Sequence, residues 1–136
     1  MAAYNKYNSA VEVMAENANI GTDVWRVILS NTAPSASNTN QASANELTTG
    51  GGYTVNGNVC ATTSSSQTAG VLKLVLADPA TWTATGGGFT FRYAILWNQT
   101  TDTLFAWWDY GSSQAVAAGE TVTVDLDQTN GVFTVQ

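Results

Sequence analysis

The chain has 136 residues, of which 44% are hydrophobic and only 10% charged, and its four basic and ten acidic residues give a net charge of -6. The absence of histidine and the single cysteine exclude Ser-His and Cys-His nucleophilic catalysis, HExxH zinc sites and multi-thiolate metal sites. The acidic balance disfavours direct binding to nucleic acid or to anionic membranes.

The length and the apolar pattern indicate one domain, 1–136, without a membrane-spanning segment. A chain of this size folds without disulfide bonds or metal ions. No apolar run reaches the roughly 20 residues that cross a bilayer, and the segment 1–6 lacks the apolar stretch of a signal peptide. We therefore expect a protein made in the cytoplasm, with no membrane partner and no direct nucleic-acid partner.

The first predicted element is a helix over about residues 5–19, the only long helix that the sequence indicates. Apolar side chains recur there at helical spacing, and Gly21 provides a natural end. Such a face usually packs on a core; the alternative is an arm that reaches a neighbouring subunit. The residues of the face are Tyr7, Val11, Met14, Ala15 and Ala18.

Strands are predicted from about residue 23 onward, where the apolar period changes to two. The first strand ends at Leu29, and its face with Arg26 is expected to be exposed to solvent. A polar stretch, 31–58, follows and is predicted to be a long loop that either covers one edge of the fold or binds a partner. Further strands are predicted over 59–65, 71–77, 81–85, 89–98, 104–110, 122–126 and 132–136.

Many short strands with glycine and asparagine turns are typical of an all-β fold. We predict a jelly-roll-like antiparallel β-sandwich with a short N-terminal helix. The dipeptide Asn130-Gly131 predicts a hairpin turn before the last strand. Two similar segments, 49–54 (TGGGYT) and 85–90 (TGGGFT), lack the spacing of a phosphate-binding loop and predict bends that enter aromatic-led strands.

The candidate groups for chemistry are few. Asp125 and Asp127 alternate on a predicted strand, and paired carboxylates serve glycosidases and calcium sites. The surrounding run does not match the register of an EF-hand loop, so a solvated strand face is the favoured explanation. Nothing near Cys60 in the sequence lowers the pKa of its thiol. We expect no catalytic residue, no cofactor and no metal ion.

Adjacent tryptophans, Trp107 and Trp108, point to opposite faces of a predicted strand. Phe105 and Asp109 are expected to share the face of Trp107. Because Asp109 is charged, we predict that this face, and Trp107 with it, points outward. There it is either covered by a loop or by the N-terminal helix, or it contacts a second polypeptide. The candidate partner contacts are Tyr4, Lys6, Tyr7, Trp107, Asp109 and Tyr110.

A series of short segments, spread over nearly the whole chain, is similar to the small virion structural proteins of tailed bacteriophages. Within that group the chain resembles the capsid cement (decoration) proteins. The segments are 4–8 (YNKYN), 31–34 (NTAP), 51–58 (GGYTVNGN), 73–84 (KLVLADPATWTA), 91–94 (FRYA), 108–113 (WDYGSS) and 119–125 (GETVTVD).

The resemblance implies a protein of the virion that is not an enzyme. Such a protein binds the outer surface of the assembled capsid, stabilises contacts between major capsid protein subunits, and is expected to be a homo-oligomer, here a dimer. The alternative is a carbohydrate- or receptor-binding module of a phage tail or head fibre, for which the strand pattern and the surplus tryptophans are suited. A small hydrolase that uses Asp125 and Asp127 is a third, weaker hypothesis.

Overall fold

A computed structural model describes residues 2–136, which are mostly β, with antiparallel sheets and one α-helix. The coarse prediction of fold class is therefore confirmed. The helices are α1 (Asn8–Glu16) and the 3-10 helix η1 (Gln41–Ala44). The strands are β1 (Ala3–Lys6), β2 (Trp25–Ser30), β3 (Asn58–Cys60), β4 (Thr62–Thr68), β5 (Val71–Leu76), β6 (Trp82–Thr83), β7 (Phe89–Asn98), β8 (Thr103–Val116), β9 (Thr121–Val122) and β10 (Phe133–Val135).

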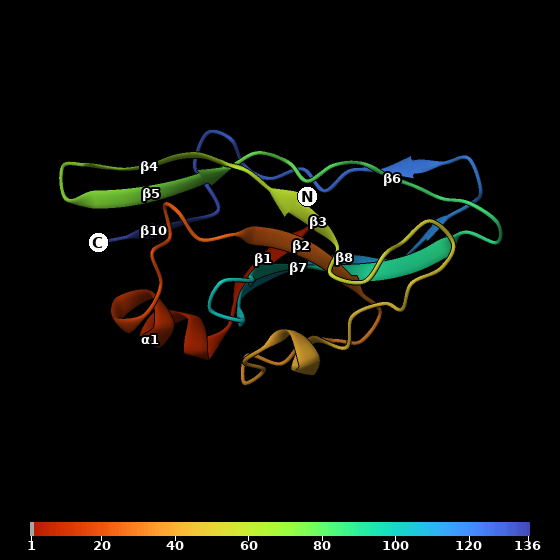
Figure 1. Ribbon diagram of the computed structural model, residues 1–136, viewed down its shortest axis with the longest axis horizontal. Coiled ribbons are helices and arrows are strands. Elements are labelled where there is room, and N and C mark those ends of the chain that lie inside the picture. The colour runs from red at the N-terminus through yellow and green to blue at the C-terminus, as the bar shows by residue number, and fades with distance from the viewer. Residues whose placement is uncertain (1) are drawn as a thin grey trace.

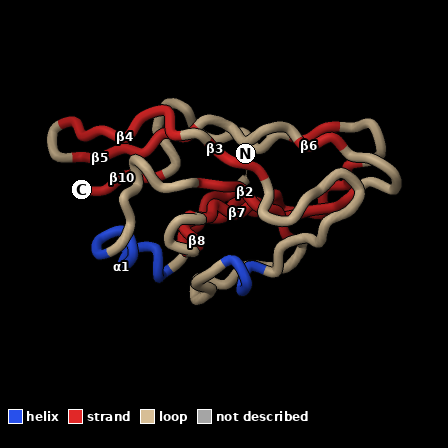
Figure 2. Tube along the Cα trace, viewed as in Figure 1, coloured by secondary structure: helices blue, strands red, loops and turns tan. Residues whose placement is uncertain are grey.

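The largest sheet has five strands in the order β1-β8-β7-β2-β3, and two smaller sheets have the orders β10-β5-β4 and β6-β9. In Figure 1 strands β4, β5 and β6 lie on one side of β2 and β7, whereas α1 lies on the other side. Figure 2 shows that the second helical segment lies on the same side as α1. The five-stranded sheet is therefore the middle layer.

Burial on both faces of the central strands follows from this arrangement. On the face toward the small sheets, Trp25 packs edge to face against Phe105 at 4.8 Å and against Phe133 of β10 at 5.8 Å between ring centroids. The opposite face of β2 was expected to be wet, but Ile28 is fully buried there and only Arg26 is half-buried. The layer of helices and loops covers the rest of that face.

The N-terminal helix is shorter than expected, because it begins at Asn8 and residues 3–6 form strand β1. β1 pairs antiparallel with β8, from Ala3 opposite Asp109 to Lys6 opposite Ala106. The pairing satisfies backbone groups that β8 would otherwise leave exposed at the sheet edge. Local helical periodicity could not reveal this long-range pairing.

The predicted buried face of the helix is corrected as well. Val11 is 50% exposed, whereas Ala10 is buried, and Val13 and Met14 pack against the core. Tyr7 precedes the helix at the N-cap position without a side-chain capping bond. The prediction is therefore right in part: Tyr7, Met14 and Ala18 pack on the core, whereas Val11 and Ala15 are exposed.

The long polar segment before β3 contacts β2 and the start of β8. The backbone N–H of Leu47 donates to the carbonyl of Leu29, and that of Leu104 donates to the carbonyl of Thr39, both at 2.9 Å. The hydroxyl of Tyr53 donates to the Glu46 carboxylate at 2.6 Å. Of the two interpretations of this loop, the covering role is thus observed.

The C-terminal part departs from the predicted strands. β9 ends at Val122, and Val124 and Leu126 are buried outside any strand. The hairpin expected at Asn130-Gly131 is wrong, because β9 pairs with β6 whereas β10 pairs with β5. The Asp127 carboxylate accepts the backbone N–H of Asn130 at 2.7 Å, and this local turn directs the chain toward β5.

Strands β4 and β5 form a hairpin whose outer part, 66–70, is exposed. In Figure 1 this hairpin extends past the end of the five-stranded sheet. Its turn residues Ala69 and Gly70 have φ values of 51° and 83°, as two-residue hairpin turns require.

Candidate binding surfaces on the two faces of strand β8

The pairing of β1 with β8 distributes the candidate contact residues over two faces. Tyr4 lies opposite Trp108 and Lys6 opposite Ala106. Because directly paired side chains share a face, Tyr4, Lys6 and Trp108 lie on one face of the sheet. Trp107, whose partner is Asn5, lies on the other face.

A bulge in β8 breaks the alternation that the sequence predicts. Leu96 pairs with Ala106, but the next residue of β7, Trp97, pairs with Leu104, so Phe105 is an extra residue. Phe105 is therefore turned toward Trp25 and the small sheets. The expectation that Phe105 and Trp107 share a face is wrong for this reason.

Trp107 is half-buried under the N-terminal segment. The ring of Tyr7, the residue before α1, lies 4.6 Å from the Trp107 ring. Tyr7 itself has 0% exposure, and burial raises the pKa of its hydroxyl. Tyr7 is thus corrected from a candidate partner contact to a core residue that covers Trp107.

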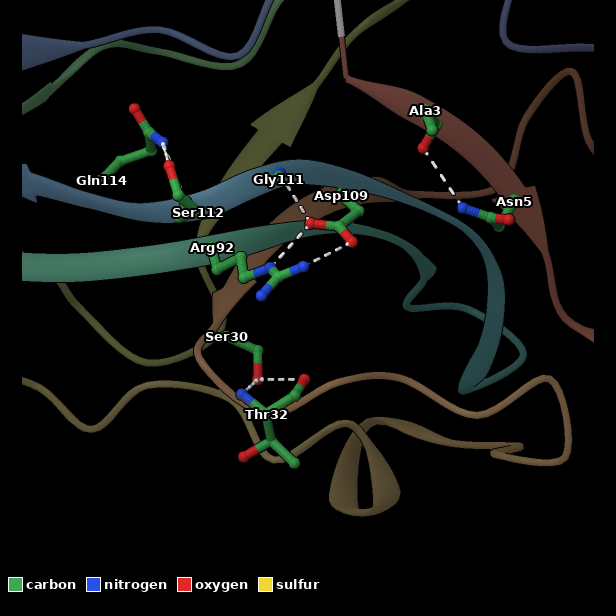
Figure 3. Close-up of polar contacts among 9 residues, drawn as sticks. All are labelled: Ala3, Asn5, Ser30, Thr32, Arg92, Asp109, Gly111, Ser112 and Gln114. Carbon is green, nitrogen blue, oxygen red and sulfur yellow. Dashed lines mark hydrogen bonds and ion pairs between the residues drawn. The ribbon is translucent and has the colours of Figure 1, made fainter.

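Asp109 lies on the same face as Trp107 and forms an ion pair with Arg92 of the neighbouring strand β7. Figure 3 shows Arg92 of β7 reaching toward the Asp109 carboxylate, toward which the backbone N–H of Gly111 also points. The Nε of Arg92 donates to Oδ1 at 2.8 Å and Nη2 to Oδ2 at 3.0 Å. These bonds lower the pKa of Asp109, with the Arg92 contact as the main cause and the Gly111 N–H second.

On the opposite face, aromatic side chains form a partly exposed group. The Tyr4 ring is 46% exposed and meets the half-buried Trp108 edge to face at 5.7 Å. Tyr110 is half-buried against Phe91, with 5.2 Å between ring centroids. We call Tyr4, Lys6, Trp108 and Tyr110 the β1 face.

A cleft adjoins the β1 face. Trp108 and Tyr110 line it together with the two carboxylates that the sequence singled out. Burial raises the pKa of the Tyr110 hydroxyl, and the charge of Asp125 adds to this shift. The lining residues are Ala2, Trp108, Tyr110, Thr123, Val124, Asp125 and Asp127.

In the described part of the chain, the remaining groups that could carry out chemistry have structural roles. Burial raises the pKa of the Cys60 thiol to about 12, which keeps it protonated. Among residues 2–136, His, Cys, Asp and Glu nowhere gather in threes as a metal site requires. None of the helices in this range has the length and apolar character to cross a membrane.

Of the six predicted contacts, the structure places Tyr4, Lys6 and Tyr110 on one face of the sheet, places Trp107 and Asp109 on the opposite face, and buries Tyr7. Trp108 was missed, although the sequence required one of the two tryptophans to face away from the other. Its partnership with Tyr4 depends on β1, which was not foreseen. The approach of Asp125 to Tyr110 was missed too.

Comparisons with protein-family models, with curated proteins and with solved structures gave no match. The function is therefore inferred from the residues and surfaces of this chain.

Proposed function

We propose that the chain is a non-enzymatic capsid cement (decoration) protein of a tailed bacteriophage. In this proposal it binds the outer surface of the assembled capsid in the virion and stabilises contacts between major capsid protein subunits. Its sheets form a jelly-roll-like β-sandwich, and it acts as a homo-oligomer, a dimer in the simplest case. The similarity of its short segments to those of phage virion structural proteins supports this proposal.

The β1 face is the observation that carries the proposal. Tyr and Trp are the residue types that dominate binding energy in protein interfaces, and here Tyr4 and Trp108 are partly exposed at a sheet edge. Strand β1 is the terminal strand of the five-stranded sheet, so one side of its backbone is available for pairing. A protein that stabilises a capsid by binding alone needs such a surface.

Linkage explains how binding stabilises a capsid. A protein that binds the assembled lattice but not free subunits stabilises the lattice by mass action. Contacts of about 1,600 Å² in total per site are sufficient for stable association, and an oligomer multiplies them through effective concentration. The low charged fraction of 10% suits hydrogen-bonded contacts that depend little on salt.

Binding to undecorated capsids tests the proposal. The purified chain is mixed with mature capsids and with free major capsid subunits, and co-sedimentation and the disruption temperature of the capsids are measured. We expect binding to capsids alone and a higher disruption temperature. Absence of binding to mature capsids would reject the proposal.

A pair of variants locates the surface. Tyr4→Ala on β1 is expected to weaken capsid binding, whereas Val59→Ala is expected to leave it unchanged. Val59 is a matched control because it is 48% exposed on β3, the opposite edge strand of the same sheet. A particle map that places the chain on a fibre would instead support the carbohydrate- or receptor-binding alternative, which the aromatic cleft also suits.

A further inference from the structure

The cleft between β8 and the segment 123–127 combines aromatic walls with negative charge. Trp108 and Tyr110 are half-buried in its lining, and Asp125 and Asp127 are exposed at its rim. Its lining includes no basic side chain. We infer that this cleft receives the guanidinium group of an arginine presented by a partner protein.

The carboxylate of Asp125 lacks a counter-ion in the described structure. Within residues 2–136, the one ion pair joins Arg92 to Asp109. The other three cations do not line the cleft: Lys6 lies opposite Ala106, Arg26 donates to Gln99 at 2.7 Å, and Lys73 donates to the carbonyl of Thr129 at 2.8 Å. Asp125 is therefore available to a cation from outside the chain.

Asp127 fixes a second negative charge at the same place. Its Oδ1 accepts the backbone N–H groups of Thr129 and Asn130 at 2.9 and 2.7 Å, and its Oδ2 accepts the Asn130 side-chain amide at 2.9 Å. These bonds, the Asn130 N–H first, lower the pKa of Asp127, and the charge of Lys73 adds to the shift. The hydrogen bonds hold the carboxylate in place beside the cleft.

The aromatic walls of the cleft pack against neighbouring rings. Tyr4 packs edge to face on Trp108, and Phe91 packs edge to face on Tyr110. Side chains that are already fixed lose little conformational entropy when a ligand binds. The raised pKa of Tyr110 keeps its hydroxyl protonated and able to donate.

The combination favours a guanidinium over a neutral sugar. A planar guanidinium stacks on an aromatic ring while its N–H groups donate to carboxylates. A neutral sugar stacks on the same rings but leaves the negative charge of Asp125 without a counter-ion. The net charge of -6 further attracts a basic partner. The identity of the partner, a capsid protein, rests on the proposed function, whereas the chemistry of the cleft does not.

A peptide titration tests the chemistry. The probe is N-acetyl-Gly-Arg-Gly-amide, and the matched peptide carries citrulline, which has the same shape without the charge. The indole N–H signals of the ¹⁵N-labelled full chain are followed by NMR, and Trp108→Phe assigns the signal of Trp108. We expect the Trp108 signal to move with the arginine peptide and not with the citrulline peptide.

Variants identify the charge that is responsible. Asp125→Asn is expected to weaken arginine-peptide binding about fivefold, in the range of partly exposed charge pairs. Glu16→Gln removes the same charge from an exposed position of α1 and is expected to have no effect. Equal responses to the two peptides, or equal effects of the two variants, would overturn the inference. So would a Trp108 response to maltotriose in the absence of one to arginine.

The capsid assay separates the two proposals. If Asp125→Asn weakens binding to capsids and Glu16→Gln does not, the cleft is the site of the capsid contact. If wild-type protein does not bind capsids but binds the arginine peptide, the proposed function is rejected and the cleft chemistry is supported. If wild-type protein binds capsids and the Trp108 NMR signal does not respond to the arginine peptide, the inference is rejected and the proposed function is supported.

Discussion

The backbone of Gly51 lies directly against the carbonyl oxygen of Gly88, which occupies the space that a Cβ atom on Gly51 would need. The carbonyl of Gly51 also accepts the N–H of Thr85 at 2.9 Å. The two TGGG segments of the sequence thus pack against each other, and the rings that follow them, Tyr53 and Phe89, lie 6.1 Å apart. Glycine at position 51 is therefore required where the two backbones meet.

Gly51→Ala is expected to lower the free energy of unfolding by about 3 kcal/mol. Its φ of 62° lies in the left-handed region, and the new methyl group overlaps the Gly88 carbonyl. Urea denaturation measures the change. Gly87→Ala is the control, because its Cβ would meet no atom within 4 Å, so stability should change by less than about 1 kcal/mol. A similar effect of the two substitutions would contradict the packing described.

Tyr4 and Trp108 are expected to be coupled energetically. Edge-to-face aromatic pairs contribute about 0.5–1.5 kcal/mol beyond the area they bury. A double-mutant cycle with Tyr4→Ala and Trp108→Ala, followed by chemical denaturation, should give a coupling energy in that range. The control cycle combines Tyr4→Ala with Trp107→Ala, whose ring lies on the other face and contacts Tyr7. Coupling of equal size in both cycles would count against the assigned faces.

Acid should destabilise the fold partly through Asp109. Its pKa is held below the ordinary value of 3.8 by the Arg92 contact. The folded state therefore favours the ionised form, so this stabilisation is complete above that ordinary value and is lost as the pH falls through the folded pKa. Calorimetry between about pH 5 and about pH 2 should show a smaller fall in Tm for Asp109→Asn than for the wild type. Identical pH profiles would refute the role of this carboxylate.

Cys60 should react with a thiol reagent such as DTNB only when the protein opens. The side chain is buried, and its pKa is raised to about 12, so the thiolate is scarce at neutral pH. We expect a negligible rate in buffer and stoichiometric labelling in denaturant. Fast labelling of the native protein would show that β3 separates readily from β2.

Local patterns predicted elements whose periodicity is carried within one segment. The predicted strand 89–98 coincides with β7, because its apolar residues are central to the sheet. Strand β1 was not predicted, since residues 3–6 become a strand only by pairing with β8, about 100 residues away in sequence. The β8 bulge at Phe105 likewise depends on its neighbour strand.

The candidate surface was predicted in part for the same reason. Tyr4 and Tyr110 were among the predicted partner contacts, and both belong to the β1 face. Trp107 was preferred over Trp108 because its predicted face carries the charge of Asp109. The structure keeps Trp107 and Asp109 on one face, but Tyr7 covers the Trp107 ring there. Asp125 was assigned to a solvated strand face, and its position beside Tyr110 results from a chain segment that forms no strand.

The protruding hairpin of β4 and β5 offers a practical use. The Cβ position of Gly70 meets no atom within 4 Å, and the surrounding residues are exposed. Exposed loop tips of this kind tolerate insertions. A foreign epitope placed between Ala69 and Gly70 is expected to leave the core and the β1 face unaltered. Under the proposed function, a capsid that binds many copies of this protein would carry the epitope as a repetitive antigen array.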